Sequence, residues 1–286
     1  MVKNKILVIT GMHCAGTSVV SEWLHACGLP LGDELLEADT IHRNGYFEDI
    51  DFLDAHRAIL KGRRLPENGF TATPLGRLAD NERDRLKDII FYKNGFNYQW
   101  GWKDPRTCLF LDTYQCLVPD AFYFIILRDC RSVVGSMLNH IYRQRERKFA
   151  SRTGLTRFLW DKVMKKREMN SLCKKYCTQY VKIWIAYNLA ILQHLEQLPA
   201  NRYIVADHDM LYANDRSFFK HITGNWGFAL KFKTFTNSYN GMPVNGSFNI
   251  DACVKDKSLI GQAGRIEEAL RRLSLPIEKV QPLMAV

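Results

Sequence analysis

Residues 11–18, Gly-Met-His-Cys-Ala-Gly-Thr-Ser, have the types and spacing of a loop that holds phosphate groups. In the nucleotide-hydrolase loop, G-x-x-x-x-G-K-[ST], backbone N–H groups hold the phosphates, a lysine reaches the terminal phosphates and a hydroxyl binds magnesium. Here both glycines and Ser18 are present, but Thr17 occupies the position of the lysine. Exposed N–H groups at a helix start still attract anions. The loop therefore predicts binding of a phosphate or sulfate without the lysine that ATP or GTP chemistry uses.

The segments on either side of the loop predict the elements that position it. Residues 5–10 form an apolar run typical of a buried parallel strand, and residues 19–27 are expected to form a helix that ends at Gly28. Further strands are expected at 98–102, 122–127 and 202–206. Alternation of such strands with helical patterns predicts an α/β fold, in which helices cover both faces of a parallel sheet in three layers.

The longest helical pattern covers residues 180–198 and ends before Pro199. Its apolar side chains recur every three or four residues, which is typical of a helix face packed on a core. These side chains are Trp184, Tyr187, Ile191, Leu195 and Leu198.

Three further segments carry residues suited to anion chemistry. Arg128 ends the strand expected at 122–127, and Ser136 follows eight residues later, so a forked cation ends the strand and a hydroxyl donor lies in the following helix. Residues 102–106 are Trp-Lys-Asp-Pro-Arg, and residues 44–49 are Asn-Gly-Tyr-Phe-Glu-Asp. Taken singly, these segments have simpler interpretations: Arg128 beside an aspartate suits a surface ion pair, and the carboxylates of 44–49 suit the start of a helix.

Taken together and in order, these segments resemble the sulfotransferases that use 3′-phosphoadenosine 5′-phosphosulfate. The loop resembles their [RK]-x-G-T-[ST] stretch, residues 103–106 resemble their K-D-P-R signature, and residues 45–48 resemble their G-Y-F-E segment. Residues 202–211 resemble the family's last strand and acidic turn, so the resemblance covers roughly residues 5–230. It implies a single domain over residues 1–286 with a fold like that of the P-loop nucleotide hydrolases.

The resemblance also implies a role for each matching residue. Arg128 and Ser136 would hold the 3′-phosphate of the donor, whose product is adenosine 3′,5′-bisphosphate, and no metal is required. Lys103 and His13 would act at the moving sulfuryl group, and Asp104 and Arg106 would contact the acceptor. Glu48 is the first candidate for the general base and Asp49 the second. The 5′-phosphosulfate would lie in the loop formed by Gly11, Met12, His13, Cys14, Ala15, Gly16, Thr17 and Ser18.

Cys14 is the main departure from the family pattern, which has arginine or lysine at this position. A thiol cannot supply that positive charge, so His13, Lys103 or Arg106 would have to compensate for it. A thiol at a helix start is also expected to have a lowered pKa and to be reactive.

The net charge of +10 is concentrated between residues 139 and 175, where twelve Lys and Arg face three Asp and Glu. This stretch is expected to be a basic helical elaboration, which would meet an anionic glycan or a membrane surface, or form a solvated face. The acceptor is expected to be a carbohydrate or glycolipid, and no nucleic-acid partner is expected. Residues 237–286 are expected to form a C-terminal loop and helix.

No secretory pattern precedes the first strand, which predicts a cytoplasmic protein whose eight cysteines are reduced. Two other functions stay open at this point. One is a nucleotide-dependent kinase with a degenerate loop, and the other is a protein that binds nucleotides or polyanions without catalysis.

Overall fold

A computed structural model of the chain describes residues 4–37, 45–150, 164–238 and 248–274. Within them, four parallel strands form one sheet in the order β2-β1-β3-β4. The strands are β1 (Lys5–Thr10), β2 (Gln99–Lys103), β3 (Phe122–Ile126) and β4 (Tyr203–Ala206). Each coincides within one residue at either end with a strand predicted from an apolar run. The expected parallel sheet is thus confirmed.

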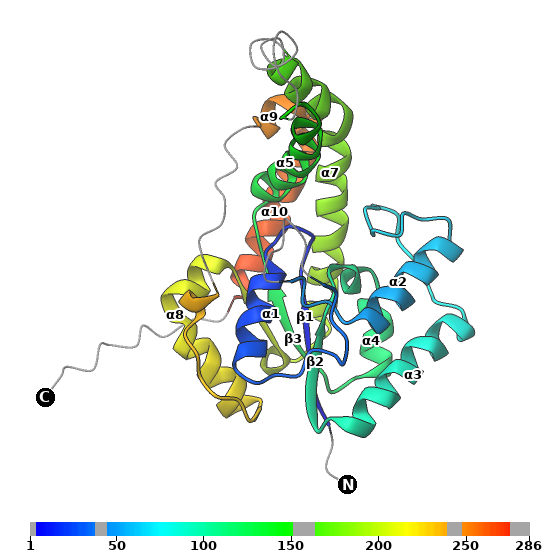
Figure 1. Cartoon of the computed structure of the whole chain (residues 1–286), viewed down its shortest axis with the longest axis vertical. Coiled ribbons are helices and arrows are strands. Elements are labelled where there is room, and N and C mark those ends of the chain that lie inside the picture. The colour runs from blue at the N-terminus through cyan, green and yellow to red at the C-terminus, as the bar shows by residue number, and fades with distance from the viewer. Residues whose placement is uncertain (1–3, 38–44, 151–163, 239–247, 275–286) are drawn as a thin grey trace, which may run out of the picture.

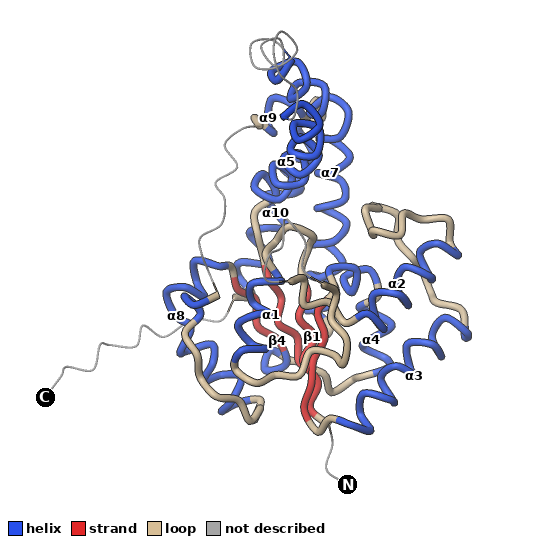
Figure 2. The backbone as a smooth tube through the Cα atoms, in the orientation of Figure 1, coloured by secondary structure: helices blue, strands red, loops and turns tan. Residues whose placement is uncertain are grey.

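Helices cover both faces of this sheet, as Figures 1 and 2 show. Ile6 and Val8 of β1 pack against one helical layer, whereas Leu7 and Ile9 pack against the other, because successive side chains of a strand point to opposite faces. One layer contains α1 (Thr17–Ala26) and α8 (His208–Lys220). The opposite layer contains α2 (Ile50–Gly62), α3 (Asp80–Phe96), α4 (Leu111–Leu117), α5 (Cys130–Ala150), α7 (Lys165–Glu196) and α10 (Lys257–Arg272). The three-layer α/β class is confirmed.

Short helical turns complete the connections between these elements. They are η1 (Pro105–Leu109), η3 (Ala200–Arg202), η4 (His221–Asn225), η5 (Phe235–Asn237) and α9 (Ile250–Cys253). The predicted C-terminal loop and helix fall on η5, α9 and α10, apart from residues 239–247 and 275–286, which lie outside the described residues.

Helices α5 and α7 lie side by side and extend well beyond the sheet (Figure 1). They contain the described parts of the basic stretch, residues 139–150 and 164–175, and both parts are helical. The prediction of a helix beginning near residue 180 is wrong, because α7 begins at Lys165. Its first turns are rich in charged residues, so the apolar stripe that marks a core-facing helix is clear only further along. That stripe is buried as expected, with Trp184, Tyr187 and Ile191 all fully inaccessible to solvent.

Candidate active site

The phosphate loop connects β1 to α1 and depends on two glycines. A Cβ on Gly11 would lie 2.3 Å from the carbonyl oxygen of Ile126 in β3, so only glycine allows this approach of two backbones. Gly16 precedes α1 with φ of 94°, a left-handed conformation that glycine adopts without strain. No side chain caps α1, and its first turn contains no acidic residue. The N–H groups of Thr17 and Ser18 are therefore available to an anion.

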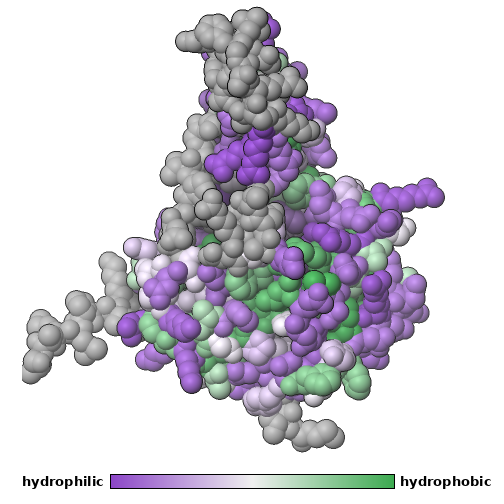
Figure 3. All heavy atoms as spheres, in the orientation of Figure 1, coloured by the Kyte–Doolittle hydropathy of each residue, from purple (hydrophilic) through white to green (hydrophobic). Residues whose placement is uncertain are grey.

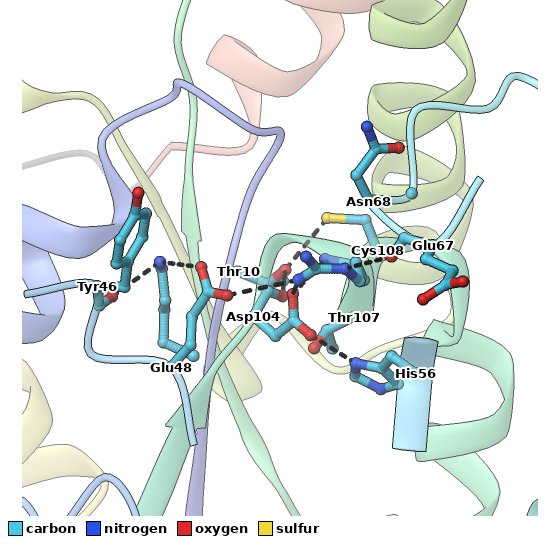
Figure 4. A network of polar contacts seen from close by, with 12 residues as sticks. Thr10, Tyr46, Glu48, His56, Glu67, Asn68, Asp104, Thr107 and Cys108 are labelled. Atoms are coloured by element: carbon cyan, nitrogen blue, oxygen red, sulfur yellow. Dashed lines mark hydrogen bonds and ion pairs between the residues drawn. The ribbon is translucent and has the colours of Figure 1, made fainter. Parts of the chain in front are cut away.

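Lys103 brings a cation to the end of this loop. It is the last residue of β2 and lies opposite Ile9 in the parallel pairing with β1. Its Nζ donates to Ser18 Oγ at 3.0 Å. The same ammonium donates to the Tyr46 carbonyl oxygen at 3.0 Å and to Glu48 Oε1 at 2.8 Å (Figure 4). The charge missing from position 17 of the loop is thus supplied by the neighbouring strand.

Arg128 joins the loop to Ser136. Its Nη1 donates to the Cys14 carbonyl oxygen at 2.8 Å and to Ser136 Oγ at 3.0 Å. Arg128 follows β3, and Ser136 lies on α5, so two residues predicted to share one phosphate do lie together beside the loop. His208, at the start of α8, supports the loop from the other side, with Nε2 donating to the Gly16 carbonyl oxygen at 3.1 Å.

Behind Lys103 lies a buried network of polar side chains, part of which Figure 4 shows. Glu48 is 6% exposed, and its second oxygen, Oε2, lies 3.4 Å from Arg106 Nη1. The same guanidinium nitrogen donates to Asp104 Oδ1 at 2.7 Å. Asp104 Oδ2 accepts from His56 Nδ1 at 2.7 Å, and His56 Nε2 lies 2.7 Å from the Tyr114 hydroxyl. Glu48 is therefore held between two cations.

Asp104 serves this network as a positioning residue. Burial opposes its ionisation, but the charge of Arg106 and the hydrogen bond from His56 outweigh burial and hold the pKa of Asp104 well below its usual range. Both oxygens are engaged and the residue is fully buried. The placement does not support the predicted contact between Asp104 and the acceptor. Arg106 is 6% exposed and also donates through Nε to the Glu67 carbonyl oxygen, so it too acts from behind Glu48.

Asp49 points away from the loop and is not a candidate base. It is the N-cap of α2, and its Oδ1 accepts from the Asp51 N–H at 2.9 Å. Its Oδ2 lies 3.0 Å from Nζ of Lys93, a residue of α3 that is itself only 1% exposed. Lys93 also pairs with Asp33 at 2.7 Å and with Asp51 at 2.8 Å. The simpler interpretation of Asp49, a helix cap, is the one that the structure supports.

His13 cannot compensate for the absent cation of the loop. Its ring lies edge-on to Phe70 at 4.8 Å and to Tyr187 at 5.9 Å between centroids. Burial, reinforced by the nearby charge of Arg106, lowers the pKa of His13 to about 3. His13 is therefore neutral at pH 7, and of the three residues expected to compensate, Lys103 is the one in contact with a loop hydroxyl.

The prediction of a lowered pKa for Cys14 is wrong. The residue is exposed, yet removal of water from around the thiol raises its pKa to about 11, and Arg128 opposes this only in part. Arg128 offsets the rise in pKa only in part because it donates its hydrogen bond to the carbonyl oxygen of Cys14 and not to the sulfur.

This raised pKa predicts slow alkylation of Cys14 near neutral pH. The thiolate is the nucleophile, so the rate of labelling by iodoacetamide is expected to rise about tenfold for each pH unit between 7 and 10. The measurement is peptide mass spectrometry of Cys14, with exposed Cys116 as the internal reference. Adenosine 3′,5′-bisphosphate should protect Cys14 and leave Cys116 unchanged. A Cys14 rate that levels off below pH 8 would contradict the assignment.

Sequence reasoning missed the residues that act behind the loop. His56 and Lys93 are isolated in the sequence and match no motif. A signal for His56 was present: it lies four residues after Phe52 and three before Ile59, on the apolar face of the helix that Asp49 begins. Tyr114 had no comparable signal, because only the tertiary fold brings it into contact with His56.

The fold of this chain is similar to that of solved sulfotransferases. Sulfotransferase STF9 from Mycobacterium avium has a solved structure similar to this chain, with a TM-score of 0.51 at 16% identity, covering 94% of this chain and 77% of that one. The sulfotransferase domain of the curacin biosynthetic pathway gives 0.46 at 12% identity, covering 94% of this chain and 98% of that one. Sulfotransferase STF1 from Mycobacterium tuberculosis H37Rv gives 0.46 at 14% identity, with coverages of 94% and 77%.

No family model matches the sequence, and no curated protein matches it. The likeness to STF9 shows the fold. Among the described residues, no helix has both the length and the apolar character needed to cross a bilayer. In the same part of the chain, no three His, Cys, Asp or Glu side chains gather in a way that could hold a metal ion.

Proposed function

We propose that the protein transfers a sulfuryl group from 3′-phosphoadenosine 5′-phosphosulfate to a hydroxyl or amine. The observation that carries this proposal is the position of Arg128, which contacts both the phosphate loop and Ser136. A donor with two separate anionic groups needs two adjacent anion sites. The loop provides one, and Arg128 with Ser136 provides the other.

The side chains at the loop suit such a donor. The uncapped N–H groups of Thr17 and Ser18, the Lys103 ammonium and the Arg128 guanidinium are all groups that can donate hydrogen bonds to an anion. The donor, when bound, supplies an activated sulfuryl group with adenosine 3′,5′-bisphosphate as its leaving group. Lys103 would stabilise negative charge at the end of the loop, where charge accumulates on the departing phosphate oxygen.

Glu48 is our proposed general base. Its buried carboxylate contacts the Lys103 ammonium, and the same ammonium contacts Ser18. Glu48 therefore lies close to the end of the loop. Arg106 and Asp104 hold it from behind, which fixes its orientation before an acceptor arrives. In this arrangement one residue stabilises the leaving group, and its direct neighbour accepts the proton of the acceptor.

The basic projection formed by α5 and α7 is the proposed docking surface for the acceptor. We propose a carbohydrate or glycolipid acceptor, with an anionic glycan or membrane surface bound by the basic faces of α5 and α7. Figure 3 shows hydrophilic side chains along the described part of this projection. Arg143, Arg147, Lys166 and Arg167 lie on it. Arg145 and Lys165 already pair with Glu168 and Glu146.

Calorimetric titration separates this proposal from its alternatives. Adenosine 3′,5′-bisphosphate should bind without metal and more tightly than ATP, with or without magnesium. Preference for magnesium-ATP would indicate a kinase. Transfer of labelled sulfate from the donor to a panel of glycans then tests catalysis, and tight binding without transfer to any acceptor would favour a binding protein.

Replacement of Arg128 by alanine is expected to weaken the binding of adenosine 3′,5′-bisphosphate by about 10- to 150-fold. A hydrogen bond to a charged group contributes about 1.5–3 kcal/mol, and the variant loses the contact to the 3′-phosphate. Isothermal titration calorimetry measures the change. Arg131→Ala is the matched control, because Arg131 lies three residues further on, is half-exposed and pairs with Asp251. Equal affinities of the two variants would contradict the role of Arg128.

A further inference from the structure

A cavity of about 600 Å³ lies on the side of α7 away from the phosphate loop. Residues 72–78, η1, the start of α4 and the first turns of α10 form its other walls. The walls are mainly apolar, with side chains such as Leu75, Leu109, Phe110, Ile185, Leu189 and Leu259. Both the volume and the composition are typical of a small-molecule site.

The cavity is separate from the candidate active site. None of its lining residues belongs to the loop, and Lys103, Glu48, Arg128 and Ser136 are absent from its walls. Tyr187 of α7 donates to the Gly69 carbonyl oxygen at 2.7 Å, just before the segment that lines the cavity. The two sites come near each other at η1, where Cys108 lines the cavity and its Sγ lies 3.1 Å from Oγ1 of Thr10, the residue before the loop. The cavity and the loop are therefore neighbouring sites with different lining residues.

The cavity has few polar groups, and its two charged side chains differ in their surroundings. Lys182 is the one cation and Asp112 the one carboxylate among the lining residues. Asp112 lies in the first turn of α4, where the partial positive charge of the helix start compensates it. Lys182 is exposed and has no carboxylate within ion-pair distance in the described part of the chain, although it lies near enough to Asp256, the N-cap of α10, to lower the pKa of that carboxyl group. Lys182 is therefore the lining cation that an anionic group in the cavity would meet.

Lining residues extend along α7 from Lys182 to Gln193. At a rise of 1.5 Å per residue, these eleven steps cover about 16 Å, so the cavity is elongated and apolar, with a cation at one end. We infer that it binds a long-chain aliphatic carboxylate, whose hydrocarbon chain lies along α7 and whose carboxylate meets Lys182. The amide of Gln262, on the adjacent face of α10, offers a further donor.

Displacement of the fluorescent fatty acid cis-parinaric acid by palmitate tests this inference on the full chain. Lys182→Glu is expected to weaken binding by at least tenfold, while Lys174→Glu, the same change at an exposed position of α7, should not. Ala190→Phe fills the cavity and should abolish binding, while Ala213→Phe adds the same ring at an exposed position of α8.

A wild-type midpoint of thermal unfolding in the Ala190→Phe variant shows that the chain is folded. Because neither this readout nor displacement of the probe involves the nucleotide, the result does not depend on the proposed function. Failure of palmitate to displace the probe, or wild-type binding by both Lys182→Glu and Ala190→Phe, would overturn the inference. Equal displacement by 1-hexadecanol would overturn the assignment of an anionic head group.

Discussion

Replacing Lys103 by alanine is expected to lower kcat for sulfuryl transfer by a factor of about 10² to 10³. Lys103 is the cation in contact with Ser18 at the end of the loop, and no charge within the loop can substitute for it. Affinity for the intact donor should change much less, because the negative charge on its bridging oxygen develops only in the transition state. Comparison of initial rates of labelled sulfate transfer with calorimetric affinities separates the two effects.

The Lys103→Ala variant also removes the main partner of Glu48, so a structural cause must be distinguished from a catalytic one. Glu48→Gln combined with Lys103→Ala removes the carboxylate that the single variant leaves beside Arg106 alone. A weakened fold in the single variant would appear as a lowered midpoint of thermal unfolding, which the double variant should restore. A single variant that is inactive but unfolds at the wild-type temperature has lost a catalytic contact. Activity near wild type in Lys103→Ala would refute the role of this residue.

Replacing Lys93 by methionine is expected to destabilise the protein by about 3–5 kcal/mol, because it leaves a buried carboxylate without its partner. Lys93 is 1% exposed and contacts three aspartates, of which Asp49 is fully buried. Urea denaturation at pH 7 measures the loss. Lys87→Met is the control, since Lys87 lies on the same helix but is exposed, and a change below about 0.5 kcal/mol is expected there.

The penalty in Lys93→Met should depend on pH with a defined sign. Burial already raises the pKa of Asp49, and loss of the neighbouring ammonium would raise it further. A raised pKa in the folded state favours the protonated form, so the variant should recover stability as pH falls from 8 to 5. Asp49→Asn in the Lys93→Met background should remove this dependence. A penalty independent of pH would show that Asp49 is not its source.

The sheet was predictable from sequence because each strand is a short apolar run beside turn residues. The continuity of α7 was not predictable: residues up to 175 were expected in a basic helical elaboration and residues from 180 in a separate helix, but one helix covers Lys165–Glu196 and packs against α5. Tertiary packing of this kind leaves no periodic signal within a short window.

At the candidate site, the residues close to the loop were predictable and their supports were not. Arg128 and Ser136 have the spacing of the family's 3′-phosphate segment, an arginine at a strand end and a serine in the following helix, so the resemblance predicted that they lie together. Glu48 and Asp49 are neighbours in sequence, yet one faces Lys103 and the other faces Lys93. The direction in which the chain enters α2 determines which of the two carboxylates faces the loop.

The position of Lys103 opposite Ile9 has a consequence for how the anion site tolerates change. The cation of the anion site belongs to β2, whereas its backbone N–H donors belong to the loop that follows β1. The pairing between these two strands therefore sets the position of the cation relative to the donors. A shift of one residue would present Trp102 or Asp104 in place of the ammonium. The loop itself therefore does not need a cationic residue, and the anion site stays positively charged with cysteine at position 14.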